Sequence, residues 1–156
     1  MNQIIEKDEL INLLPHKDKM FLLTRVNSYD IEKNIIEAQY EISSDCIFYN
    51  QQNDGIPSWV SFELMAQGVS ALTGISDKIK NRSPQAGCIL SVMNYKSTLP
   101  FIKCGTTVNI NAEEDFADHE SHVYKYRCIV SDSADKSIIA ESEITVMKVK
   151  DMESLF

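Results

Sequence analysis

The chain has 156 residues, a length that fits one globular domain, and 44% of them are hydrophobic, which is enough for a sizeable core. Its 15 basic and 23 acidic residues give a net charge of −8, so general binding to nucleic acid is not expected. No apolar run reaches the roughly 18 residues of a membrane span, and the polar, acidic N-terminus does not resemble a signal peptide. We therefore expect one domain over residues 1–156 and, by default, a cytoplasmic location.

The part of the chain before residue 58 predicts a short helix and a pair of strands. The expected elements are a helix over 5–13 ended by Pro15, strands over 20–26 and 35–42, and a turn over 30–34. Apolar and polar residues alternate in the second strand, which predicts one buried face. Residues 43–58 are expected to form a loop.

The strongest helical pattern begins at Ser58 and runs to Ile75. Its apolar residues recur at helical spacing and cover most of the circumference, which indicates a helix buried on nearly all sides. Ser58 is the expected N-cap residue. A charged loop over 76–84 is expected to follow. This loop carries three basic residues, Lys78, Lys80 and Arg82.

The C-terminal half predicts four strands joined by hairpin loops. They are expected over 87–97, 106–115, 122–131 and 137–149, with loops at 116–121 and 132–136. One buried helix against a long antiparallel sheet is an α+β arrangement.

Metal and redox sites are not indicated. The four cysteines form no C-x-x-C pair and are expected to be buried free thiols; they are Cys46, Cys88, Cys104 and Cys128. His119 and His122 lie close to five acidic residues, where a divalent metal is conceivable. The strand–turn–strand pattern around these histidines favours a solvated hairpin tip instead.

Glu63 is the most informative single residue. It lies about one and a half turns into the predicted helix among apolar neighbours, with Gln67 one turn later on the same face. A carboxylate in that place is costly unless it is paired or protonated. Burial should raise its pKa, whereas the helix N-terminus should lower it. Such a carboxyl can serve as a general acid or base, and the alternative is a structural hydrogen bond to a neighbouring strand.

Two segments carry a resemblance to a known family. LLPHKDKMFLLTRV at 13–26 and PSWVSFELMAQG at 57–68 resemble the N-terminal and central-helix motifs of the 3-hydroxyacyl-[acyl carrier protein] dehydratases. The strand pattern continues to the C-terminus, so the resemblance covers most of the chain. It is greatest to the ApeP-like dehydratase subunit of aryl polyene pathways. The resemblance implies a hotdog fold, in which an antiparallel sheet wraps a long central helix.

The resemblance also implies an activity, which is dehydration of a 3-hydroxyacyl thioester to the 2-enoyl thioester in fatty acid or aryl polyene biosynthesis. It implies a dimer that uses no metal or cofactor, and a substrate borne by an acyl carrier protein. The basic residues of loop 76–84 are candidates for docking that acidic carrier, or simply a solubilising surface. Glu63 would give a proton to the departing hydroxyl. Backbone N–H groups near Ser58 and Trp59 would stabilise charge on the thioester oxygen.

The sequence leaves the base open. Members of the family carry a histidine in a G-H-F-P motif, and that position falls on Tyr49 here. Two further positions depart from the family pattern, where Ser58 replaces a glycine and Thr24 an aspartate. Either His16, in the L-P-H motif, supplies the base, or a partner subunit supplies it.

The residues expected to contact the substrate are Ser58, Trp59, Gln67 and Tyr49.

Because the base is not identified, two alternative functions stay open. A hotdog thioesterase, in which Glu63 activates water, is one alternative function. A non-catalytic subunit of a dehydratase heterodimer is another, and both homodimers and heterodimers are compatible with the sequence.

Overall fold

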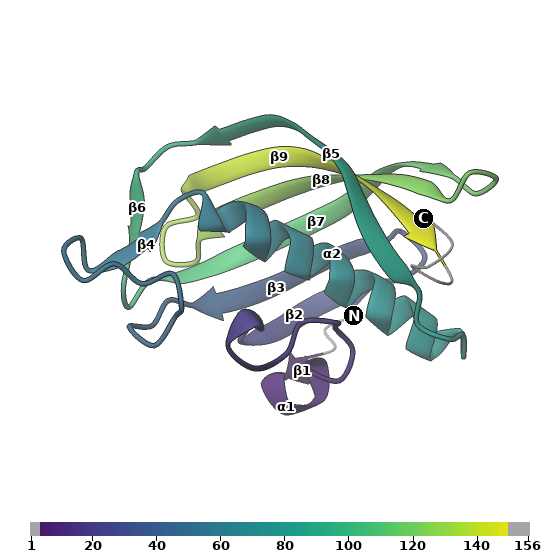
Figure 1. Cartoon of the computed structure of the whole chain (residues 1–156), viewed down its shortest axis with the longest axis horizontal. Coiled ribbons are helices and arrows are strands. Elements are labelled where there is room, and N and C mark those ends of the chain that lie inside the picture. The colour runs from purple at the N-terminus through teal and green to yellow at the C-terminus, as the bar shows by residue number, and fades with distance from the viewer. Residues whose placement is uncertain (1–3, 150–156) are drawn as a thin grey trace.

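A seven-stranded antiparallel sheet curves around one long helix in the computed structural model, which describes residues 4–149 (Figure 1). The helix, α2, spans Val60–Ile79. The strand order across the sheet is β1-β2-β3-β7-β8-β9-β5. These strands are β1 Ile5–Glu6, β2 Arg25–Asp30, β3 Ile35–Glu41, β5 Ala86–Ser97, β7 Thr107–Asp118, β8 Val123–Asp132 and β9 Ile138–Val149. The smaller elements are α1 Lys7–Leu10, the 3-10 turn η1 Asp18–Met20, and a second sheet of β4 Gly55–Pro57 with β6 Phe101–Lys103.

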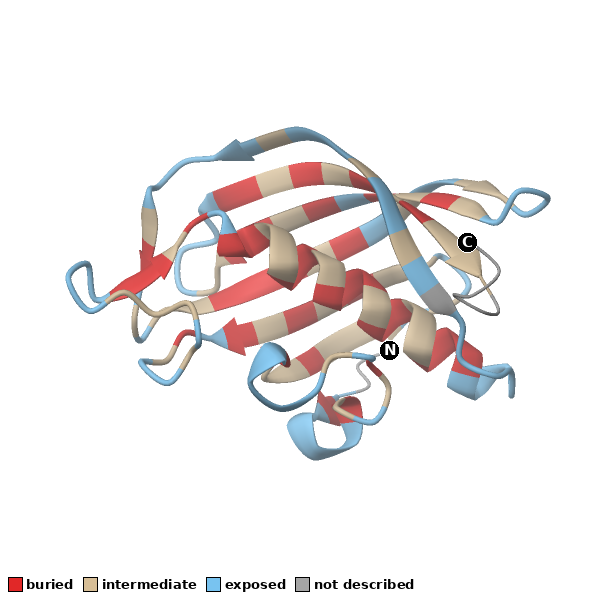
Figure 2. Ribbon diagram, viewed as in Figure 1, coloured by how far each residue is buried: buried red, intermediate tan, exposed pale blue. Residues whose placement is uncertain are grey.

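The core lies between α2 and the face of the sheet that the helix packs against (Figure 2). On the helix, Val60, Leu64, Met65, Ala71 and Leu72 are at most 1% exposed. The predicted alternation in β3 is confirmed, because every second residue from 36 to 42 is buried. Burying such side chains is the main favourable term in folding. The α+β arrangement expected from the sequence is therefore confirmed.

The segment before β2 departs from its predicted strand. The strand begins at Arg25 rather than at residue 20, although Phe21, Leu22 and Leu23 are all buried. The reason is a hydrogen bond from Leu22 N–H to the Gln67 side chain, which replaces a strand partner. The helix predicted over 5–13 is also wrong in extent, since two residues of strand precede the single turn α1.

Both ends of the central helix differ from their predicted positions. Trp59, not Ser58, is the N-cap residue, and no side chain caps the helix. At the other end α2 continues to Ile79, so most of the expected loop is helical. Asp77 is buried there because Arg82 pairs with its carboxylate at 3.1 Å. The polar residues of this segment predicted a loop, because the sequence did not indicate that a paired charge would be buried there.

Within the described range, no group of three or more His, Cys, Asp or Glu side chains is placed to hold a metal ion. His119 lies in the β7–β8 hairpin turn, as predicted. All four cysteines are free, but Cys128 alone among them is fully buried, and burial raises its pKa to about 12. The expectation of buried thiols is therefore wrong for the other three, which are half-buried. No helix among residues 4–149 is long and apolar enough to cross a membrane.

Gly74 allows the N-terminal segment to pass close to α2, because a Cβ at this position would collide with the backbone carbonyl oxygen of Leu13. We predict that Gly74→Ala lowers the free energy of unfolding by about 1–3 kcal/mol, although alanine favours helices by about 1 kcal/mol. Urea denaturation measures this difference. Gly87→Ala is the control, since a Cβ there meets no atom within 4 Å. Equal stability of the two variants would contradict the close contact.

Candidate active site

The two residues predicted to be catalytic meet within one chain. Glu63 lies in the first turn of α2, and His16 lies in the N-terminal segment that crosses the helix. His16 Nε2 is 3.2 Å from Glu63 Oε1. The two side chains are 21% and 23% exposed, respectively, so each is largely shielded from water yet reachable. This contact brings the candidate base and the candidate acid together.

Gln67 fixes the position of the Glu63 carboxylate. Its side chain is fully buried, and its Oε1 accepts a hydrogen bond from Leu22 N–H at 2.9 Å. Its Nε2 donates to the Met20 carbonyl at 2.7 Å and to Glu63 Oε1 at 3.1 Å. Because the oxygen is committed to a donor and the nitrogen to an acceptor, only one amide orientation satisfies all the bonds. Gln67 is therefore a positioning residue in the free protein, and its contact with the substrate stays a prediction.

Burial raises the pKa of Glu63, but the hydrogen bonds from His16 and Gln67 outweigh this effect and hold the pKa below its ordinary value. The carboxylate is consequently ionised at neutral pH. An ionised carboxylate only accepts hydrogen bonds, so His16 carries its proton on Nε2. The other ring nitrogen, His16 Nδ1, is buried and has no hydrogen-bond partner among residues 4–149.

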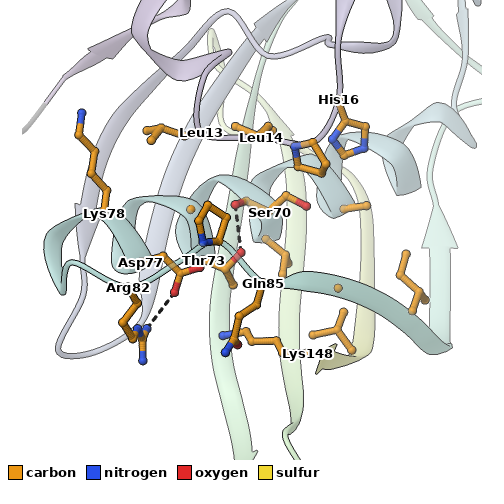
Figure 3. A pocket seen from close by; sticks show the side chains of 18 of the residues that line it. Leu13, Leu14, His16, Ser70, Thr73, Asp77, Lys78, Arg82, Gln85 and Lys148 are labelled. Carbon is orange, nitrogen blue, oxygen red and sulfur yellow. Dashed lines mark hydrogen bonds and ion pairs between the residues drawn. The ribbon is translucent and has the colours of Figure 1, made fainter. Parts of the chain in front are cut away.

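A cavity of about 890 Å³ begins at this pair and follows α2 toward its C-terminus (Figure 3). Its volume is that of a small-molecule site. The walls come from the N-terminal segment, α2, the start of β5 and the end of β9. The apolar lining includes Ala66, Val69, Ile89, Ile144 and Val146. The end far from His16 is polar and is lined by Asp77, Lys78, Asn81, Arg82, Gln85 and Lys148.

The other predicted site residues lie elsewhere, because Tyr49, Ser58 and Trp59 do not line this cavity. The Tyr49 hydroxyl donates to Asp54 Oδ1 at 2.6 Å. Ser58 N–H donates to the Pro100 carbonyl at 3.0 Å, so this N–H is not free to stabilise an oxyanion. Trp59 is 56% exposed at the start of the helix.

Sequence reasoning missed the polar far end of the cavity, although a signal for it exists. Ile144, Val146 and Lys148 alternate along β9 and therefore share one face of the sheet. The two apolar residues line the cavity, and the lysine extends the same row. An inward-facing lysine at the end of an apolar row indicates a polar site.

Removing His16 should raise the pKa of Glu63, because one of the two hydrogen bonds that lower it is lost. We predict this shift for His16→Ala, measured by carbon NMR titration of the Glu63 carboxyl. The stabilising effect of ionised Glu63 is present above its ordinary pKa and is lost as pH falls through its folded pKa, so the variant should lose acid stability less steeply. His119→Ala is the control: it removes a histidine at the tip of the β7–β8 hairpin and should leave the pKa of Glu63 unchanged. A Glu63 pKa that is the same in both variants would refute the pairing.

Comparison with known proteins relates the chain to a family of dehydratases. The ApeP dehydratase family, described as ApeP-like, matches residues 9–156. The 3-hydroxyacyl-[acyl-carrier-protein] dehydratase FabZ of Chlamydia caviae is 26% identical over 155 residues, covering 97% of this chain and 96% of that protein. FabZ of Chlamydia pneumoniae is 34% identical over 80 residues, covering 48% of this chain and 52% of that protein.

Solved structures share the fold. The dehydratase heterocomplex ApeI:P from Xenorhabdus doucetiae has a chain that is 20% identical, with a TM-score of 0.82 and 94% of each chain covered. A hypothetical thioesterase protein with coenzyme A from Streptococcus pneumoniae is 10% identical, with a TM-score of 0.61, covering 81% of this chain and 85% of that one. The predicted hotdog fold and the predicted dehydratase class of lyase are confirmed. The chain belongs to the ApeP-like dehydratase family.

Proposed function

We propose that this chain dehydrates a 3-hydroxyacyl thioester, borne by an acyl carrier protein, to the 2-enoyl thioester, with His16 as base and Glu63 as acid. The observation that carries the proposal is the 3.2 Å contact between His16 Nε2 and Glu63 Oε1 at one end of the cavity. Family membership and the FabZ relatives support the reaction. Fatty acid and aryl polyene biosynthesis are the pathways in which such a reaction belongs.

The elimination moves one proton into the pair and one out. Neutral His16 takes the C2 proton on Nδ1, and the imidazolium passes its Nε2 proton to Glu63 Oε1. Protonated Glu63 then donates this proton to the 3-hydroxyl, which leaves as water while the C2 electron pair forms the double bond. This relay explains how a carboxylate that is ionised in the free protein becomes the acid. Because Nδ1 is covered in the free chain, the substrate reaches it by displacing the segment that carries His16.

The thioester oxygen gains negative charge as the C2 proton leaves. The N-terminal end of α2 is suited to stabilise this charge, because backbone N–H groups and the helix dipole favour anions there. Ser58 N–H is occupied, but Trp59 N–H donates to no acceptor within residues 4–149. Trp59 lies outside the cavity, but it precedes Glu63 by about one turn of helix and is therefore next to the end of the cavity that holds the pair. We therefore assign this N–H to the thioester oxygen.

A second candidate function is favoured by Tyr49. Its hydroxyl bonds to Asp54 and it lies outside the cavity, so within this chain it does not replace the family histidine. The second candidate is a subunit of a dehydratase heterodimer, in which a related chain supplies the base and this chain supplies Glu63. The solved dehydratase heterocomplex ApeI:P, which has a chain of the same fold, supports this second proposal.

The β5 edge supports association with another hotdog subunit. β5 is the last strand of the sheet, and among the described strands it pairs with β9 alone. Its exposed apolar residues are Ile89, Leu90, Val92 and Met93. A long, exposed, apolar edge strand is a site where another chain pairs. We infer that the protein acts as a dimer, formed with a second copy or with a related chain.

Substitution of the pair tests the reaction. Glu63→Gln keeps the shape but cannot transfer a proton, so turnover of a 3-hydroxyacyl carrier protein should fall about 10²–10⁴-fold. Turnover by the His16→Ala variant should fall as far, and exchange of the substrate C2 hydrogen with solvent should also stop. The intact mass of the acyl carrier protein follows dehydration, and free thiol release would identify a thioesterase instead.

The wild-type chain alone distinguishes the two proposals. Turnover without a partner, lost in His16→Ala, supports the pair in one chain. A lone chain that is inactive, and becomes active with a partner even when it carries His16→Ala, would assign the base to that partner. Wild-type turnover in Glu63→Gln would remove this residue from the mechanism.

Disruption of β5 tests the dimer. We predict that the purified chain has a dimeric mass by light scattering, and that Leu90→Asp with Met93→Asp shifts it to the monomer. Charges on a paired edge are unfavourable because they lose water on association. Phe116→Asp is the matched control, since this residue is also exposed but lies in the β7–β8 hairpin. A monomeric wild-type chain would contradict self-association through β5.

A further inference from the structure

Lys148 presents an ammonium group to the far end of the cavity. It lies on β9, is half-buried, and lines the cavity at the end opposite His16 (Figure 3). Its Nζ is 4.2 Å from the centroid of the Tyr124 ring, within the range of a cation–π contact. This contact holds the ammonium in place while leaving its hydrogens available.

Lys148 differs from the other two basic residues of the cavity wall. Arg82 is 3.1 Å from Asp77, and Lys78 is 3.3 Å from Glu9. Within residues 4–149, Lys148 makes no ion pair. Burial lowers the pKa of Lys148, although the charges of Asp77 and Glu114 act to raise it. An ammonium that is partly desolvated and unpaired is stabilised when an anion binds beside it.

The position of Lys148 indicates which anion it would meet. Most of the cavity wall at this end is made of exposed residues, so this end opens to solvent; they are Lys78, Asn81, Arg82, Pro84 and Gln85. The opposite end holds the acid–base pair. Glu63 and Asp77 are separated by about 21 Å along the axis of α2. The open end therefore gives a thioester a path along the cavity to Glu63 while its carrier stays outside.

We propose that Lys148 binds the phosphate of the carrier protein's phosphopantetheine arm. This proposal rests on the proposed function, because it takes the ligand to be a carrier-bound thioester. The phosphate joins the arm to the carrier, so it stays near the opening while the thioester lies at Glu63. Asp77 does not oppose it, since Arg82 already neutralises this carboxylate. The arm therefore spans the cavity between Lys148 and the catalytic pair.

Binding of two small probes tests this directly. Pantetheine 4′-phosphate and pantetheine differ only in the phosphate, and calorimetry compares their affinities for the full chain. A charge-assisted contact predicts that the phosphate strengthens binding to the wild type by about 10-fold or more. Lys148→Met should abolish this difference and Lys148→Arg should keep it. Lys103→Met, which removes a lysine from β6 in the other sheet, is the control and should behave as wild type.

Equal affinity of the wild type for the two probes, or a phosphate effect that survives in Lys148→Met, would overturn the proposal. A third probe is an acyl N-acetylcysteamine thioester that ends in a carboxylate and has no phosphate. If binding of this probe alone depends on Lys148, the subsite belongs to the acyl tail and the proposal is also overturned. If the chain binds the phosphate probe more tightly but does not dehydrate the substrate, the proposed reaction is refuted and the phosphate site is not.

Discussion

The hydrogen bonds of the Gln67 side-chain amide are the interaction on which the site depends. They join the Met20 carbonyl and the Leu22 N–H, more than 40 residues away in sequence, to the Glu63 carboxylate one helical turn before Gln67. Each buried polar group left without its partner would cost about 1–3 kcal/mol. The amide thus keeps the segment before β2 out of the sheet and against the helix. In the same place it orients the carboxylate that His16 meets.

This dependence explains what the sequence could and could not predict. Helical spacing placed Glu63 and Gln67 on one face of a buried helix, and strand alternation located most of the sheet. The contact of His16 with Glu63 was not predictable from local patterns, because residues 20–26 have the pattern of a strand. Their path is decided by a side-chain hydrogen bond formed across the fold. Tertiary contacts of this kind override local propensity.

The end of the central helix shows a second limit of local pattern. Ser76 and Asp77 are polar, which is typical of a loop, yet both are buried in the last turns of α2. Asp77 is tolerated because Arg82 pairs with it from beyond the helix end. The same pair shapes the opening of the cavity. A sequence pattern records the polarity of each residue, whereas the partner that offsets it appears only in three dimensions.

The substitution of Tyr49 for the family histidine bears on how the remaining site works. In this chain His16 and Glu63 lie in direct contact, and the hydrogen bond from His16 lowers the pKa of Glu63. In the proposed relay, Glu63 receives its proton from the same residue that keeps it ionised in the free protein. Under that proposal, Glu63 becomes an acid only after His16 has accepted a proton, which orders the two steps of elimination. A base supplied across a subunit interface would not need this contact with the carboxylate. The direct contact is therefore what favours a reaction completed within one chain.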